Sequence, residues 1–97
     1  MRGTGVRPVW RSRVQPVVIY TREFCGYCTR ALTLLRRKEI PFEQIDCTMD
    51  QALRNEMREK TGGSTFPQVL IGGKPIGGSD ALQALEDRGE LDALLNA

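Results

Sequence analysis

The stretch Val17-Val-Ile-Tyr-Thr-Arg-Glu-Phe-Cys25-Gly-Tyr-Cys28 carries most of the structural information in this chain of 97 residues. It opens with a run of β-branched and aromatic residues, which predicts a short buried strand, and a helical pattern begins directly after Cys25. A C-x-x-C pair alone fits half of a zinc site, a structural disulfide or a redox pair. The start of a helix favours the redox pair, because unpaired backbone N–H groups and the helix dipole stabilise an anion there. A thiol so placed ionises readily, and the thiolate is the form that attacks disulfides.

The rest of the chain alternates between strand and helix patterns. We expect strands over 16–20, 42–46, 68–71 and 74–76, and helices over 26–38, about 49–61, from Ser79 to Gly89 and at the C-terminal end. The segment Thr48-Met-Asp-Gln51 has the spacing of a capping box, and Gly72-Gly73 predicts a two-residue hairpin turn with positive φ at both positions. This order predicts an α/β fold in which helices cover a small mixed sheet. The first crossover should be parallel and right-handed.

Charge is distributed unevenly along the chain. The net charge is +2, but residues 1–15 hold four of the 14 basic residues and no acid, which leaves 10 basic against 12 acidic residues in the remainder. That remainder is therefore not basic, which argues against a nucleic-acid surface. Residues 1–15 show no periodicity, and we expect a disordered basic tail followed by one domain over 16–97. The tail could be an extension upstream of the natural start, a native arm or a targeting presequence.

The cysteine count and the hydropathy suggest where the protein works. No apolar stretch approaches the ~20 residues of a membrane span, and no secretory signal is visible near Met1. Three cysteines are an odd number, which suits a reducing compartment with one reactive pair better than a secreted disulfide framework. We expect a cytoplasmic protein without a membrane partner.

Four motifs in order resemble the glutaredoxin family, over about Pro16 to Leu95. They are Tyr20-Thr-Arg-Glu-Phe-Cys25-Gly-Tyr-Cys28, Thr65-Phe66-Pro67, the Gly72-Gly73 hairpin and Gly77-Gly78-Ser79-Asp80. The second cysteine is typical of the dithiol class, and no tryptophan stands beside Cys25 as it does in most thioredoxins. The resemblance implies a thioredoxin-like fold with a four-stranded mixed sheet flanked by helices. It also implies a glutathione-dependent thiol–disulfide oxidoreductase that reduces glutathione mixed disulfides and protein disulfides.

The resemblance implies roles for ten residues. Cys25 would be the nucleophile and Cys28 the resolving thiol. Eight residues would contact glutathione: Arg22, Tyr27, Thr65, Phe66, Pro67, Gly78, Ser79 and Asp80. In the family a cis-proline exposes the preceding backbone to the cysteine of glutathione, a basic residue near the first strand approaches the glycine carboxylate, and the aromatic of the C-x-x-C motif flanks the groove.

The γ-glutamyl end of glutathione would bind at the start of the third helix. In the family, backbone N–H groups there take its carboxylate, while acidic side chains take its amino group. This chain has Ala81 where a second aspartate is frequent, so the amino group is left to Asp80 and we expect weaker glutathione binding. It also has Phe66 where valine is more frequent in the family. The larger side chain makes the wall of the glutathione groove bulkier but leaves the backbone contact with the cysteine of glutathione unchanged.

Two further interpretations concern metals. Gly26 stands where proline is commonest in dithiol members, and members with a small residue there can hold a [2Fe–2S] cluster between two subunits, with Cys25 and glutathione as ligands. Such a protein would be a dimer; otherwise we expect a monomer. A zinc site is disfavoured, because the chain has no histidine and only Cys47 beyond the pair. Cys47 itself could be a free structural or semi-exposed thiol, or a site of glutathionylation or intermolecular disulfide formation.

Overall fold

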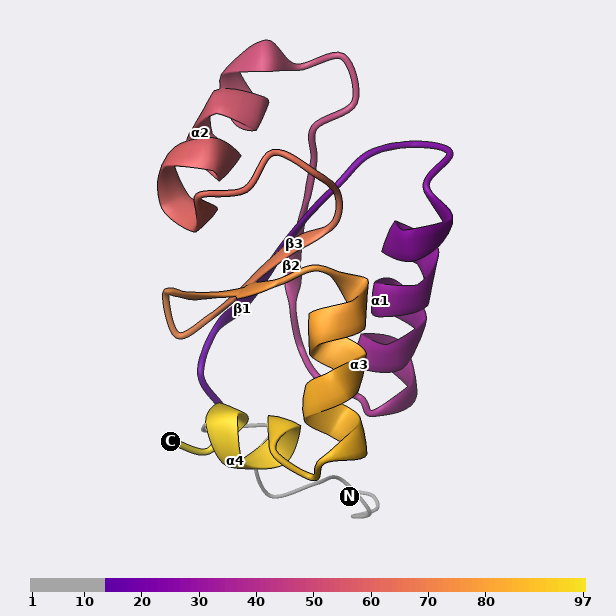
Figure 1. Ribbon diagram of the computed structural model, residues 1–97, viewed down its shortest axis with the longest axis vertical. Helices are drawn as coiled ribbons and strands as arrows, with labels where there is room; N and C mark the ends of the chain where they lie inside the picture. The colour runs from indigo at the N-terminus through magenta and orange to yellow at the C-terminus, as the bar shows by residue number, and fades with distance from the viewer. Residues whose placement is uncertain (1–13) are drawn as a thin grey trace, which may run out of the picture.

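The computed structural model describes residues 14–97 (Figure 1). In chain order the elements are β1 (Val17–Thr21), α1 (Gly26–Arg37), β2 (Glu43–Asp46), α2 (Gln51–Thr61), β3 (Gln68–Ile71), β4 (Lys74–Gly77), α3 (Ser79–Asp87) and α4 (Leu91–Leu95). Most of the expected basic tail lies outside the described residues. Two of its members, Val14 and Gln15, instead contact the domain: Val14 packs on the core, and the backbone N–H of Gln15 donates to Leu95 O at 2.8 Å.

The four strands form one mixed sheet in the order β2-β1-β3-β4. The crossover from β1 to β2 is parallel, as expected, whereas β3 runs antiparallel to both β1 and β4. The predicted hairpin between β3 and β4 is confirmed, because Gly72 and Gly73 have φ values of 58° and 81°. The parallel pair and the hairpin together determine which loops meet at each edge of the sheet.

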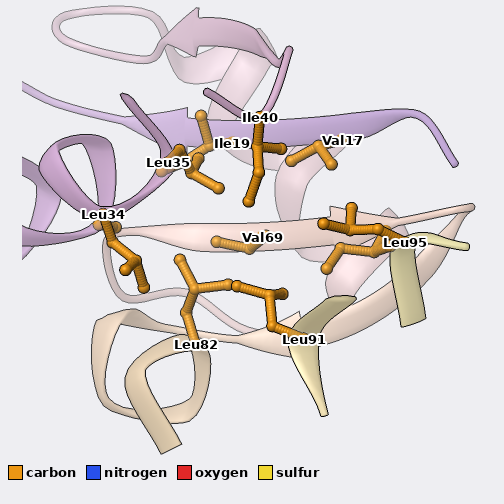
Figure 2. Close-up of a cluster of buried hydrophobic side chains, with 11 residues drawn as sticks. Val17, Ile19, Leu34, Leu35, Ile40, Val69, Leu82, Leu91 and Leu95 are labelled. Carbon is orange, nitrogen blue, oxygen red and sulfur yellow. The ribbon is translucent and has the colours of Figure 1, made fainter. Parts of the chain in front are cut away.

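Helices cover both faces of the sheet (Figure 1). On one face α1, α3 and α4 contribute Leu35, Leu82 and Leu91 to the larger core cluster, which also includes Val17 and Ile19 of β1 (Figure 2). On the other face α2 packs Met57 onto a smaller cluster of buried residues, Tyr20, Cys47 and Leu70. The uninterrupted apolar run of β1 follows from this arrangement, because both of its faces are covered.

The predicted start of α2 is wrong by two residues. Its N-cap is Asp50, whose carboxylate accepts from the backbone N–H of Leu53 at 3.0 Å, and not Thr48 of the expected capping box. The Thr48 hydroxyl instead accepts from the backbone N–H of Glu23 at 2.7 Å, which joins it to the loop after β1. The hydrogen bond between Thr48 and Glu23 therefore takes the place of the expected cap at Thr48. The predicted end of α2 is confirmed, since Gly62 adopts the left-handed conformation with φ 77°.

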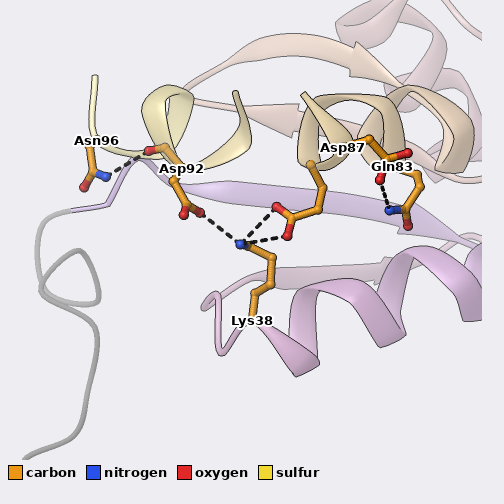
Figure 3. A network of polar contacts seen from close by, with 6 residues as sticks. Lys38, Gln83, Asp87, Asp92 and Asn96 are labelled. Carbon is orange, nitrogen blue, oxygen red and sulfur yellow. Dashed lines mark hydrogen bonds and ion pairs between the residues drawn. The ribbon is translucent and has the colours of Figure 1, made fainter. Parts of the chain in front are cut away.

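A partly buried lysine joins the end of α1 to the last two helices (Figure 3). Lys38 Nζ lies 3.0 Å from the carboxylate of Glu86 and 3.2 Å from that of Asp92. Burial disfavours the charge of Lys38, but hydrogen bonds to these two carboxylates outweigh that effect and raise its pKa. The network holds α3 beside α1.

Of the helices within residues 14–97, none has the length and apolar character needed to cross a membrane.

Candidate active site

Four chain segments meet at one edge of the sheet. Thr21 pairs with Asp46 at the ends of the parallel strands β1 and β2, so the loops that follow these strands leave the sheet together. Because β3 is antiparallel to β1, it begins at this edge, with Gln68 opposite Tyr20. β4 returns to the same edge at Gly77. Across the edge the order is therefore the loops after β2 and β1, then the loop before β3, and last the start of α3.

Cys25 is the N-cap of α1. Its backbone is extended, with φ −125° and ψ 107°, and its Sγ accepts from the backbone N–H of Cys28 at 3.3 Å. Cys25 is 9% exposed, which by itself would disfavour the thiolate. The hydrogen bonds from Cys28, the charge of Arg22 and the backbone N–H of Tyr27 outweigh that burial and lower the pKa of Cys25 below its ordinary value. The sequence prediction of an easily ionised thiol at this position agrees with this geometry.

Cys28 lies one helical turn further in and has the opposite tendency. It is 3% exposed, and burial together with the neighbouring sulfur of Cys25 raises its pKa to about 11. Both cysteines are free thiols. The site therefore pairs one thiol that ionises readily with a second that keeps its proton while the first is charged.

The turn before β3 brings backbone to the reactive sulfur. The Phe66–Pro67 peptide bond is cis, as the family resemblance implies, and Phe66 O lies 3.8 Å from Cys25 Sγ. The buried side-chain amide of Gln68 donates to Thr65 O at 3.0 Å and thereby holds the turn. On the outer side, the guanidinium of Arg54 lies over the Phe66 ring, 5.3 Å from its centroid.

A groove of about 430 Å³ opens beside this turn. It is lined by Tyr27, Thr65, Phe66, Pro67, Gly78, Ser79, Asp80 and Ala81. Seven of the eight residues expected to contact glutathione thus share one groove, although they come from three separate segments. Gly78 allows the start of α3 to approach the turn before β3 closely, since a Cβ at this position would lie 3.2 Å from Pro67 O. Gly78 is also the N-cap of α3 and gives no side-chain cap, so the first N–H groups of that helix can receive an anion.

The family model described as Glutaredoxin matches residues 17–76. The chain belongs to the glutaredoxin family. It is similar to a glutaredoxin from Pseudomonas aeruginosa, with 51% identity over 82 residues that cover 84% of this chain and 98% of the relative.

Solved glutaredoxin structures have the same thioredoxin-like fold. The solution structure of glutaredoxin from Brucella melitensis matches with a TM-score of 0.75 and 51% identity, covering 86% of this chain and 90% of that one. The crystal structure of a buckwheat glutaredoxin–glutathione complex matches with a TM-score of 0.74 and 30% identity, covering 89% and 79% of the two chains. The predicted fold class, including the four-stranded mixed sheet flanked by helices, is confirmed.

One of the eight expected glutathione contacts lies outside the groove. Arg22 folds back onto its own loop, where its guanidinium donates to Glu23 O at 3.0 Å. Its charge still acts on Cys25. Conversely, sequence reasoning missed Arg30, whose guanidinium lies 5.6 Å from the centre of the Tyr27 ring and 3.9 Å from the Asp80 carboxylate. The spacing of Tyr27 and Arg30 on a predicted helix was the available signal, because residues three apart share one face.

Cys47 is the third cysteine of this chain, and its side chain is fully buried. It lies among Tyr20, Met57 and Leu70, and burial raises its pKa. Of the two roles left open by the sequence, the geometry favours the structural thiol, because a thiol with no exposed surface is out of reach of disulfides in the folded protein.

Proposed function

We propose that this chain is a glutathione-dependent thiol–disulfide oxidoreductase with Cys25 as its nucleophile. The observation that carries the proposal is the placement of the Cys25 sulfur, which accepts from the Cys28 N–H at the start of α1 and lies 3.8 Å from a backbone carbonyl of the groove wall. This environment lowers the pKa of Cys25. The buckwheat relative was solved as a glutathione complex. A reducing, cytoplasmic setting would supply the glutathione.

The groove has the chemistry to bind an extended tripeptide beside Cys25. The backbone of Phe66 would pair with the cysteine of glutathione in the manner of an added strand. The N–H groups at the start of α3 would receive the γ-glutamyl carboxylate, and Asp80 would receive the amino group. For this contact Asp80 must exchange its ion pair with Arg30, which costs little because both side chains are well exposed. Arg22 would face the glycine carboxylate after a change of rotamer.

The proposed reaction exchanges one disulfide for another in two steps. The thiolate of Cys25 attacks the glutathione sulfur of a mixed disulfide, so that a Cys25–glutathione bond forms, the substrate bond breaks and the protein leaves as a thiolate that takes a proton from solvent. The thiolate of a second glutathione then attacks the same glutathionyl sulfur. Glutathione disulfide leaves, and Cys25 is again a thiolate. A low pKa favours the second step most, because it makes Cys25 a better leaving group.

Cys28 would serve only protein disulfides. In that reaction Cys25 first forms a mixed disulfide with the protein substrate and loses its negative charge. That charge and its hydrogen bond are among the causes that raise the pKa of Cys28, so their loss favours ionisation of Cys28 at the moment it is needed. Cys28 then attacks the sulfur of Cys25, releases the reduced protein and leaves an intramolecular disulfide that two glutathiones reduce.

The test is the reduction of a glutathione mixed disulfide coupled to glutathione reductase. The full chain should be active, Cys25→Ser should be inactive, and Cys28→Ser should keep activity on this substrate while losing it on a protein disulfide. Equal loss in both variants would contradict the assigned roles. Activity that requires thioredoxin reductase instead of glutathione would contradict the proposed reductant.

A glutathione-ligated [2Fe–2S] dimer is the second candidate, and the open surface at Gly26 favours it. Beyond its chain neighbours and the backbone of α1, no atom of the described chain lies within 4 Å of a Cβ built at Gly26, so another subunit can approach α1 closely at this point. Within residues 14–97, no group of three or more metal-ligating side chains gathers at one place. Cys25 would therefore supply one thiolate, and the other ligands would come from glutathione and a second copy. Anaerobic expression with glutathione should give a brown dimer, whereas a colourless monomer would exclude this candidate.

A further inference from the structure

Three large apolar side chains are exposed in the structure, and two of them lie within two residues of Cys25 in the chain. Phe24 is 97% exposed, Met49 is 94% exposed and Tyr27 is 58% exposed, and they are the exposed large apolar residues found within residues 14–97. Tyr27 lines the groove already described. Isolated exposed apolar residues need no explanation, but a group of them around one reactive atom marks a contact site.

The sheet places Phe24 and Met49 at the same edge. Thr21 and Asp46 are paired at the ends of the parallel strands β1 and β2, and Phe24 and Met49 each follow three residues later. The two loops are joined one residue before each apolar side chain, where the N–H of Glu23 donates to the Thr48 hydroxyl at 2.7 Å. Both loops lie at the upper end of the view in Figure 1. Phe24 and Met49 therefore lie on adjoining loops, and the loop of Phe24 leads directly into Cys25.

The backbone at both positions is unusual. Phe24 has φ 55° and Met49 has φ 60°, in the left-handed region where a residue with a Cβ is disfavoured and glycine or asparagine is common. Neither side chain is buried, so packing does not compensate for this backbone. Residues that serve only the fold would be smaller or more polar at such positions. These two exposed side chains thus point to a contact outside the chain.

We propose that Phe24 and Met49 bind the protein half of the substrate and favour apolar residues next to its disulfide-bonded cysteine. This inference rests on the proposed function. The strand order places the glutathione groove on the β3 and β4 side of Cys25, and Met49 on the β2 side. Glutathione in the groove leaves the β2 side to the protein. Phe24 directly precedes Cys25 in the chain, so a polypeptide whose sulfur reaches Cys25 must pass close to it.

The experiment compares three substrates and four forms of the full chain. The substrates are a glutathionylated peptide with leucine on both sides of its cysteine, the same peptide with serine at those positions, and the small cysteine–glutathione disulfide. The forms are the natural chain, Phe24→Asn, Met49→Asn and a control. Asparagine tolerates the left-handed backbone, so the loops should keep their shape. The matched control is Glu39→Asn, because Glu39 is the third residue other than glycine with positive φ among residues 14–97, at 57°, and it lies beyond the other end of α1.

We expect the natural chain to prefer the leucine peptide over the serine peptide in kcat/KM. Phe24→Asn and Met49→Asn should each lower kcat/KM for the leucine peptide about tenfold, as the loss of a buried apolar contact predicts, and leave kcat/KM for the other two substrates unchanged. Glu39→Asn should change none of the three. Equal losses on all substrates, or no loss on the leucine peptide, would overturn this inference alone. No activity of the natural chain on cysteine–glutathione would instead overturn the proposed function.

Discussion

Cys25 and Cys47 have the same side chain, follow neighbouring strands and leave the sheet at the same edge, yet their thiols have opposite properties. Cys25 follows β1, caps a helix and receives the N–H of Cys28, and its pKa is lowered. Cys47 follows β2, has no exposed surface, and has a raised pKa. The difference shows that burial alone does not determine the reactivity of a thiol, because Cys25 is itself only 9% exposed. The decisive feature is the set of donors that face the sulfur.

The sharpest test of this difference is selective alkylation. With a small reagent such as iodoacetamide near pH 7, Cys25 should react at least about a thousandfold faster than Cys47, because Cys47 becomes accessible only when the domain opens. The rate at Cys25 should rise with pH and level off below the ordinary thiol pKa of about 8.5, since its pKa is lowered. Mass spectrometry of the digested protein reports both sites. Comparable rates at the two cysteines would remove the basis of the comparison.

The same substitution at both positions should separate activity from stability. Cys47→Ser places a hydroxyl among Tyr20, Met57 and Leu70 and should lower the free energy of unfolding by about 2 kcal/mol, while activity persists. Cys25→Ser should abolish activity with little effect on stability, because serine is a good N-cap. Urea denaturation and the coupled assay measure the two effects. A Cys47→Ser protein that is stable but inactive would assign Cys47 a direct role that burial argues against.

A smaller effect should follow from removing the charge of Arg22. Arg22→Gln should raise the pKa of Cys25, so that alkylation at pH 6 slows about two- to fivefold, while the rates of the two proteins should converge as the pH rises and the thiol ionises in both. The alkylation rate is measured instead of turnover because Arg22 is also a proposed glutathione contact. Arg58→Gln on α2 is the matched control, since it removes another exposed arginine that is not among the groups acting on the pKa of Cys25. A change of the alkylation rate by the same factor at all pH values would instead indicate that the substitution altered access to the Cys25 sulfur.

Local patterns predicted the elements well but missed contacts between them. The hairpin at Gly72-Gly73 and the end of α2 at Gly62 follow from glycine chemistry, and the structure confirms both. The expected cap at Thr48 failed because its hydroxyl bonds to Glu23, which lies 25 residues earlier in the chain. The exposure of Met49, which follows Thr48 in the chain, could not be predicted from the sequence either, because it depends on which loop lies beside Met49 in the fold.

The amino-acid sequence by itself determined the order of strands and helices, the placement of a cysteine at a helix start and the resemblance to the glutaredoxins, because these features depend on neighbouring residues. The resemblance implied that Phe66, Gly78 and Tyr27 contact one ligand, but only the tertiary structure decided which groove they line, that Arg22 lies outside it, and that Cys47 is enclosed. The reason is the sheet register, which brings together residues up to about 50 positions apart. Periodicity along the chain carries no information on such distances, whereas the packing of two helix layers on the sheet specifies them.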